Sequence, residues 1–179
     1  MTFIELARTR QSVRKYLNRP VDKEKIDLCI EAARIAPSAC NAQPWKFIVV
    51  DEPVLKENVA KATFSTVAPF NKFALQAPVM IVIVMEKPNF LSQFGGRVKD
   101  KDFYLFDIGI AAEHFCLQAA ELDLGTCMLG WFNEKEVVKL LGIPSKKRIG
   151  LLISLGYPDC QLREKIRKPK DVMSSDNKY

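Results

Sequence analysis

Residues 37–45 read Pro37-Ser38-Ala39-Cys40-Asn41-Ala42-Gln43-Pro44-Trp45. They lie between a predicted helix, which Asp22 can cap and which runs to about Ala36, and the β-prone run 46–50. Two prolines hold a loop that presents one hydroxyl and two carboxamides. Because a carboxamide both donates and accepts hydrogen bonds, such a loop suits the edge of a flat heterocycle. The alternative is an ordinary capping loop; for Trp45 itself, we favour a core aromatic.

Outward from this loop, helical and apolar patterns follow one another at irregular spacing. We expect helices over residues 2–8, 102–123 and 133–141, and buried strands over residues 46–50, 79–85 and 148–155. About four strands interleaved with helices, without a regular strand–helix repeat, predict an α+β or mixed α/β fold. We expect a single domain, 1–179, in which residues 161–179 form an extended basic arm.

The predicted helix 102–123 is apolar over most of its circumference. Its polar residues share one narrow stripe, which consists of Asp107, His114, Gln118 and Glu121. A helix of this kind must be covered on several sides, and a partner subunit is one source of that cover.

Positive charge gathers near both ends of the chain. The formal net charge is +6, and residues 146–170 carry eight basic side chains against two acidic ones. A second basic group lies within residues 8–19 and includes Arg10-Gln11-Ser12-Val13-Arg14. Guanidinium groups donate in a fork that fits phosphate oxygens, and serine adds a neutral donor. The two groups could hold one anion together or mark a nucleic-acid surface, and a solvated basic turn is the alternative for residues 10–14. Neither G-x-G-x-x-G nor a P-loop lysine signature is present, so a bound nucleotide would need another kind of phosphate site.

Several functional classes are disfavoured by composition. The five cysteines are scattered without a C-x-x-C pair, and there is a single histidine, so we expect no zinc, iron–sulfur or disulfide framework. Free and mostly buried thiols in a reducing compartment are the simplest interpretation. No apolar run approaches the ~20 residues that span a bilayer, and the charged N-terminus has no signal-peptide character, so we expect a cytoplasmic protein with no membrane partner.

Six motifs in register resemble the nitroreductase family of FMN-dependent oxidoreductases. Arg10-x-Ser12-Val13-Arg14 is followed by Pro37-Ser38-x-x-Asn41-x-Gln43-Pro44-Trp45, and then by Asp107-Ile108-Gly109-Ile110-Ala111-Ala112, Leu124-Gly125-Thr126-Cys127-Met128-Leu129-Gly130, Leu140-Leu141-Gly142-Ile143-Pro144 and Leu155-Gly156-Tyr157-Pro158. The resemblance covers essentially the whole chain. It implies a mixed, mainly antiparallel sheet flanked by helices, in an intertwined homodimer with FMN at the subunit interface.

The resemblance also implies a role for individual residues. Arg10 and Ser12 match contacts to the FMN phosphate and ribityl chain, and Arg14 matches a basic position near the ribityl and the pyrimidine side of the ring. Pro37, Ser38, Asn41 and Gln43 match a loop that the other subunit lays against the isoalloxazine. Leu129 and Gly130 match the backbone beside the reactive N5 edge. Lys165 and Arg167 match a phosphate-binding pair, and Asn71 matches a further cofactor contact across an alignment gap.

In such a protein, electrons pass from NADH or NADPH through FMN to a small electron-poor acceptor, such as a nitroaromatic or a quinone. The chemistry belongs to the flavin. We therefore expect no catalytic side chain, and we discount Cys40, Cys127 and His114 as catalytic groups, while Arg14 is the candidate that stabilises negative charge on the reduced ring.

Two other functions stay open from the sequence. One is an FMN enzyme of the same fold with another reaction, either dehalogenation or chemistry that consumes the flavin. The other is a basic nucleic-acid-binding module, which we disfavour because no aromatic residue lies between Tyr157 and Tyr179 to stack on bases. Residues 86–103 depart from the family pattern and could form a lid over the flavin.

Overall fold

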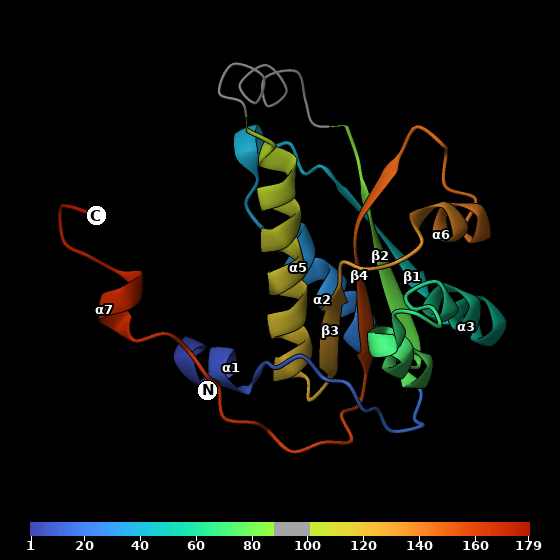
Figure 1. Cartoon of the computed structure of the whole chain (residues 1–179), viewed down its shortest axis with the longest axis horizontal. Coiled ribbons are helices and arrows are strands. Elements are labelled where there is room, and N and C mark those ends of the chain that lie inside the picture. Colours follow the sequence, from blue (N-terminus) through green and yellow to red (C-terminus); the bar gives the residue numbers. More distant parts are fainter. Residues whose placement is uncertain (88–100) are drawn as a thin grey trace.

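Four antiparallel strands form the sheet on which the rest of the chain is arranged (Figure 1). The computed structural model describes residues 1–87 and 101–179. The strands are β1 (Trp45–Val50), β2 (Val79–Met85), β3 (Gly125–Leu129) and β4 (Arg148–Gly156), in the spatial order β1-β2-β4-β3. Each neighbouring pair runs antiparallel. The α+β prediction is confirmed, and the parallel component is an isolated bridge between Ser12 and Thr126.

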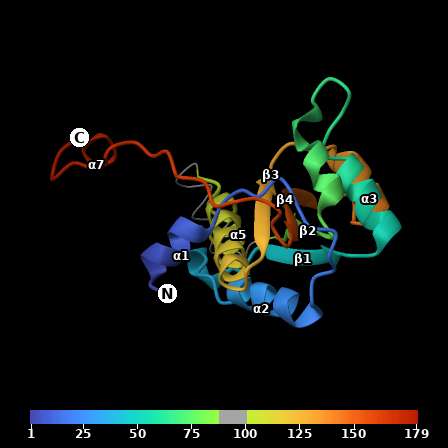
Figure 2. The same ribbon diagram turned by 90° about the horizontal axis from the view of Figure 1, so that it is seen from below.

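Helices cover both faces of this sheet (Figure 2). On one face lie α2 (Lys23–Arg34) and α5 (Phe103–Glu121), and on the other lie α3 (Pro53–Lys61), the 3-10 helix η2 (Pro69–Gln76) and α6 (Glu134–Leu140). The sequence analysis did not predict α3 or η2. Helix α1 (Phe3–Thr9) lies beside α5.

The central strand β2 shows why the sheet needs cover on both sides. Because side chains alternate along a strand, Val79, Ile81 and Ile83 pack with α2 and α5, whereas the even-numbered residues 80, 82 and 84 pack against the other helical layer. All of these side chains are buried. Fully burying a side chain of this size contributes about 1.5–3 kcal/mol to folding, so this strand supports both cores at once.

Side chains cap α1 and α6, whereas the predicted cap of α2 is not formed. Thr2 and Glu5 form a capping box at the start of α1, and the Asn133 side chain accepts from the Glu136 amide at the start of α6. Asp22 does precede α2, but its side chain makes no cap hydrogen bond. Its Oδ2 instead accepts from the Tyr157 hydroxyl at 3.0 Å, because Tyr157 closes β4 against this corner.

Helix α5 differs from the predicted polar stripe in one respect. Asp107 is 3% exposed and turns inward, so it does not lie on a solvated face. The expectation that this chain leaves the helix incompletely covered agrees with three apolar side chains at the surface, Leu105, Phe106 and Ile110. Within residues 1–87 and 101–179, no helix has both the length and the apolar character needed to cross a bilayer.

The C-terminal arm leaves β4 and runs past α1 (Figure 1). Figure 1 shows it passing below α5 and ending away from the sheet. It is extended except for one short turn of helix, α7 (Lys170–Met173). Most of the predicted lid segment, residues 88–100, lies outside the described residues.

Candidate functional site

A basic pocket forms where the N-terminal segment, residues 10–14, meets the C-terminal arm. Its volume is about 400 Å³. Its lining combines residues more than 150 positions apart in sequence: Arg10, Gln11, Ser12, Arg14, Arg163, Glu164, Lys165, Ile166 and Arg167. The structure thus brings Arg10 and Arg14 of the first basic group together with Arg163, Lys165 and Arg167 of the second.

The N-terminal segment is fixed by its inward-facing residues. The Val13 amide donates to the Thr126 carbonyl at 2.8 Å, and the buried Tyr16 hydroxyl contacts the Val13 carbonyl and the Ser154 hydroxyl at 2.9 and 2.8 Å. The close approach requires Gly125, because a Cβ there would stand 2.6 Å from Cγ2 of Val13. Since side chains alternate in extended chain, anchoring Val13 inward leaves its neighbours Ser12 and Arg14 facing the pocket.

The arm is held against this segment by polar contacts. Arg163 Nη2 donates to the Ser12 carbonyl at 2.9 Å, and Lys165 Nζ donates to the Arg10 carbonyl. The Gln11 side chain binds the arm backbone at two points, accepting from the Arg163 amide at 3.1 Å and donating to the Gln161 carbonyl at 3.1 Å. Sequence reasoning did not single out Arg163, because nothing distinguishes it from its neighbours in a basic run.

The charges in the basic pocket are incompletely balanced. Arg10 Nε pairs with Glu113 Oε1 of α5 at 3.1 Å, which orients the guanidinium along the pocket. Burial, together with the nearby Arg10 and Arg167, lowers the pKa of Lys165. Such mutual repulsion among cations is relieved when an anion lies between them, so the geometry suits a phosphate-sized dianion.

The carboxamide loop, residues 38–43, lies away from the basic pocket in the folded chain. None of its residues lines the basic pocket; it lies by the N-terminal turns of α5 (Figure 1), where the Ala39 amide donates to Asp107 Oδ1 at 2.9 Å. Pro37 precedes it and the 3-10 turn η1 (Ala39–Asn41) lies within it. The predicted heterocycle contacts and the predicted phosphate contacts are therefore separate within one chain.

Within the loop, the predicted polar side chains bond to one another. Gln43 Nε2 donates to Asn41 Oδ1 at 3.0 Å, and the Gln43 amide donates to Ser38 Oγ at 2.9 Å. Cys40, Asn41 and Gln43 all have φ near +50°. The left-handed region is unfavourable for residues with a Cβ, so surrounding contacts must hold this backbone.

Asn71, Leu129 and Gly130 meet at the turn that follows β3. Leu129 is buried at the end of the strand, and Gly130 is exposed directly after it. Asn71 is 7% exposed, and its Nδ2 donates to the carbonyls of Thr63 and Trp131 at 3.2 and 3.1 Å. Asn71 therefore fixes the backbone that follows Gly130 by means of its amide nitrogen.

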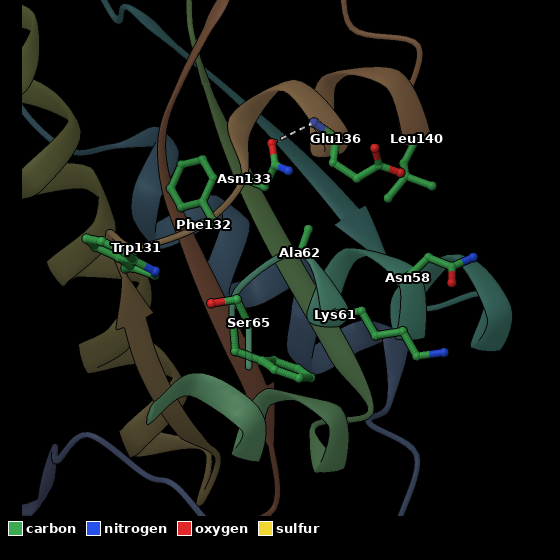
Figure 3. Close-up of a pocket in the computed structure, with 10 residues that line it drawn as sticks. Asn58, Lys61, Ala62, Ser65, Trp131, Phe132, Asn133, Glu136 and Leu140 are labelled. Atoms are coloured by element: carbon green, nitrogen blue, oxygen red, sulfur yellow. Dashed lines mark hydrogen bonds between the residues drawn. The ribbon is translucent and has the colours of Figure 1, made fainter. Parts of the chain in front are cut away.

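A second cavity of about 710 Å³ opens beside this turn, between α3 and α6 (Figure 3). Trp131 and Phe132 form an aromatic side of it, and Lys61 and Glu136 supply charge. Trp131 also makes an edge contact with Phe70, with ring centroids 5.8 Å apart. Sequence reasoning missed this aromatic pair, although each member is adjacent to a predicted site residue.

Cys29, Cys116 and Cys127 are buried, whereas Cys40 and Cys160 are exposed. Burial raises the pKa of the Cys29 and Cys116 thiols to about 12 and also raises that of Cys127. A thiol that stays protonated is a poor nucleophile. His114 Nδ1 lies 3.3 Å from the Ala32 carbonyl, where it links α5 to α2. In the described part of the chain, no cluster of three or more His, Cys, Asp or Glu side chains could hold a metal ion.

Comparison with known proteins extends these observations. The model of the nitroreductase family matches residues 7–157. A protein of Archaeoglobus fulgidus with the provisional name NADH dehydrogenase/NAD(P)H nitroreductase is 32% identical, over 98% of this chain and 92% of its own. The solved FMN-dependent nitroreductase of Clostridium difficile R20291 superposes with a TM-score of 0.76 at 29% identity, covering 99% of this chain and 100% of its own. An iodotyrosine deiodinase of Thermotoga neapolitana is 25% identical, over 87% of this chain and 88% of its own.

Proposed function

The chain belongs to the nitroreductase family, and on that premise we propose that it is an FMN-dependent oxidoreductase that passes electrons from NADH or NADPH to a small electron-poor acceptor, such as a nitroaromatic or a quinone. The observation that carries the proposal is the basic pocket, in which Arg10, Lys165 and Arg167 converge from both ends of the chain. A phosphate monoester carries nearly two negative charges and three acceptor oxygens, which this donor set fits.

The residues of the basic pocket would hold the cofactor by its phosphate end. Arg10, Lys165 and Arg167 would bind the phosphate, and Ser12 would donate to the phosphate or the ribityl chain. Arg14, whose guanidinium carbon lies 5.9 Å from the centre of the Phe73 ring, would lie toward the pyrimidine side of the isoalloxazine. When bound, FMN supplies the hydride and electron chemistry, and the protein positions it.

The isoalloxazine would lie between two subunits. In one chain the carboxamide loop is separate from the basic pocket, so Ser38, Asn41 and Gln43 would reach the ring bound by a second copy. The exposed apolar side chains of α5 support a homodimer, because a contiguous apolar surface on a soluble protein favours burial against a partner. Leu129, Gly130 and Asn71 would lie along the reactive edge.

The first experiment is reconstitution. The purified protein should bind FMN with a flavin absorbance spectrum and release it on denaturation, and it should oxidise NADH or NADPH anaerobically with a quinone or a nitroaromatic as acceptor. Protein that stays colourless after incubation with FMN would refute the cofactor assignment. If the protein binds FMN but oxidises neither NADH nor NADPH, the cofactor assignment stands and the proposed electron transfer is refuted.

Reductive dehalogenation is the second candidate, favoured by the similarity to the Thermotoga neapolitana protein named as a deiodinase. The same anaerobic assay separates the two functions when an iodinated tyrosine replaces the quinone. Release of iodide at a rate comparable to quinone reduction would favour dehalogenation. Chemistry that consumes the flavin is tested in parallel, because it would bleach the FMN during turnover.

A further inference from the structure

Asp107 is a buried carboxylate that the proposed cofactor contacts do not include. It lies in the fifth position of α5 and is 3% exposed. Its Oδ1 accepts from the Ala39 amide at 2.9 Å, and its Oδ2 has no hydrogen-bond partner among the residues that the structure describes. A buried carboxylate is unfavourable unless its contacts offset the loss of hydration, so its position calls for a structural or functional reason.

Asp107 contacts the carboxamide loop at Ala39, directly before the residues with left-handed backbone conformation. Directly after Ala39, the backbone enters the left-handed region at Cys40 and Asn41, and it returns there at Gln43. Several of the hydrogen bonds in this loop join loop residues to one another, such as the Asn41 amide to the Ser38 carbonyl at 3.0 Å. These local bonds shape the loop without fixing it relative to the rest of the fold. The bond from Ala39 to Asp107 does fix it, because α5 packs on the sheet.

Helix α5 contacts the last turns of α2 at one point and the carboxamide loop at another. His114 lies seven residues after Asp107, which is two helical turns, and its Nδ1 is 3.3 Å from the Ala32 carbonyl. Ala32 and Ala39 are also seven residues apart, on either side of the end of α2 at Arg34. The position of the loop is therefore set by α5, and Asp107 acts on the part that carries the carboxamides.

We propose that Asp107 is a positioning residue: through the Ala39 amide it holds the carboxamide loop in the place on the fold from which Ser38, Asn41 and Gln43 reach the flavin. This inference rests on the proposed function, because the loop side chains would contact the cofactor and Asp107 would not. Releasing the anchor lowers the fraction of molecules with a binding-competent loop, and the apparent dissociation constant rises by the inverse of that fraction.

The test compares Asp107→Asn with Asp107→Leu. Asparagine keeps a carbonyl oxygen that can accept from Ala39, whereas leucine has a similar size and no acceptor. The matched control is Lys25→Met. It removes a hydrogen bond that does not involve the loop, from Lys25 Nζ on α2 to the carbonyl of Leu122 at the end of α5, at 3.0 Å. Circular dichroism and thermal melts establish that each variant is folded before binding is measured.

Two measurements are made on each variant. In the FMN-free protein, hydrogen exchange of the peptide that contains Ala39 should be at least ~10-fold faster in Asp107→Leu and near wild type in Asp107→Asn and Lys25→Met. In titrations, Asp107→Leu should weaken FMN and riboflavin binding by the same factor, on the order of 10-fold or more, because the loop contacts the ring and not the phosphate.

Each result bears on the inference in a definite way. Unchanged exchange in Asp107→Leu, or faster exchange with unchanged affinity for both flavins, would overturn it. An Asp107→Asn variant as impaired as Asp107→Leu would also overturn it, because the charge rather than the acceptor would then matter. If the wild-type protein binds no flavin, the proposed function fails, and the exchange measurement alone shows whether Asp107 anchors the loop.

Discussion

Replacing Lys165 with methionine tests the basic pocket most directly. The substitution keeps an unbranched apolar stem and removes the ammonium group that donates to the Arg10 carbonyl and lies near Arg167. Burial and these two cations already lower the pKa of Lys165 in the cofactor-free protein. A bound phosphate would attract the charged ammonium group instead. Losing that group should therefore destabilise the FMN complex more than it destabilises the cofactor-free protein.

The expected magnitude follows from the exposure of the site. A hydrogen bond to a charged group contributes about 1.5–3 kcal/mol when well sheltered. Lys165 is only half-buried and the neighbouring arm residues are exposed, so water screens part of the interaction. We therefore take the lower part of the range, about 1.5–2 kcal/mol, which corresponds to a rise of roughly 10- to 30-fold in the FMN dissociation constant.

The assay is a fluorescence titration of FMN and riboflavin into the cofactor-free protein. Riboflavin lacks the phosphate, so its affinity should change by less than about twofold in Lys165→Met. The matched control is Lys168→Met, which removes an equal charge from an exposed position of the arm outside the pocket lining. Equal losses for FMN and riboflavin, or equal losses in the two variants, would refute a phosphate contact at Lys165.

The pH dependence gives the same assignment an independent check. Only protonated Lys165 attracts the phosphate, and its pKa lies below the ordinary value of 10.5. FMN affinity should therefore fall as the pH rises through this lowered pKa, and this alkaline decrease should disappear in Lys165→Met. On the acid side, affinity should fall in both proteins below about pH 6, where the phosphate takes up its second proton. An alkaline decrease of equal size in both proteins would argue against Lys165.

Three further substitutions test how the site is supported. Gly125→Ala places a Cβ 2.6 Å from Val13 Cγ2 and should lower the free energy of unfolding by about 1–3 kcal/mol in urea titrations, with recovery when Val13→Ala is added. Tyr16→Phe removes the buried hydroxyl that contacts Ser154 Oγ at 2.8 Å and should lower the same quantity by about 1–3 kcal/mol; an unchanged midpoint would contradict this. Arg14→Gln should make the midpoint potential of bound FMN more negative by about 30–60 mV, since 30 mV corresponds to about 1.4 kcal/mol for two electrons. An unchanged midpoint potential would contradict the proposed position of Arg14 near the isoalloxazine ring.

The sequence predicted the elements that have strong periodic or apolar signals. Strand β2 begins and ends at the predicted residues, Val79 and Met85, because an uninterrupted apolar run after a proline has few other interpretations. Strand β3 was not predicted, since its five residues, which include a glycine and a threonine, show no clear alternation of apolar and polar side chains. Helix α3 and η2 were not predicted, and both are short, with nine and eight residues.

At the candidate site, charge was easier to predict than burial. A shared anion was one of two interpretations of the basic groups, and the structure places Arg10, Arg14, Arg163, Lys165 and Arg167 on one pocket. Asp107 was assigned to a polar stripe, because a helical projection places residues on faces but does not show what packs against each face. Its inward turn depends on the carboxamide loop, which lies 68 positions earlier in the sequence.

The basic pocket couples the cofactor to the arm. The arm contacts the N-terminal segment mainly through polar groups, and Arg10, Lys165 and Arg167 repel one another when no anion is present. An anion changes that repulsion into attraction from both sides, so binding of FMN and docking of the arm should stabilise each other, as reciprocal linkage requires. The exposed side chain of Ile166 lies on the same stretch of arm, where a second subunit could cover it. We therefore expect FMN to protect the arm from proteolysis and to strengthen the proposed homodimer, with both effects reduced in Lys165→Met.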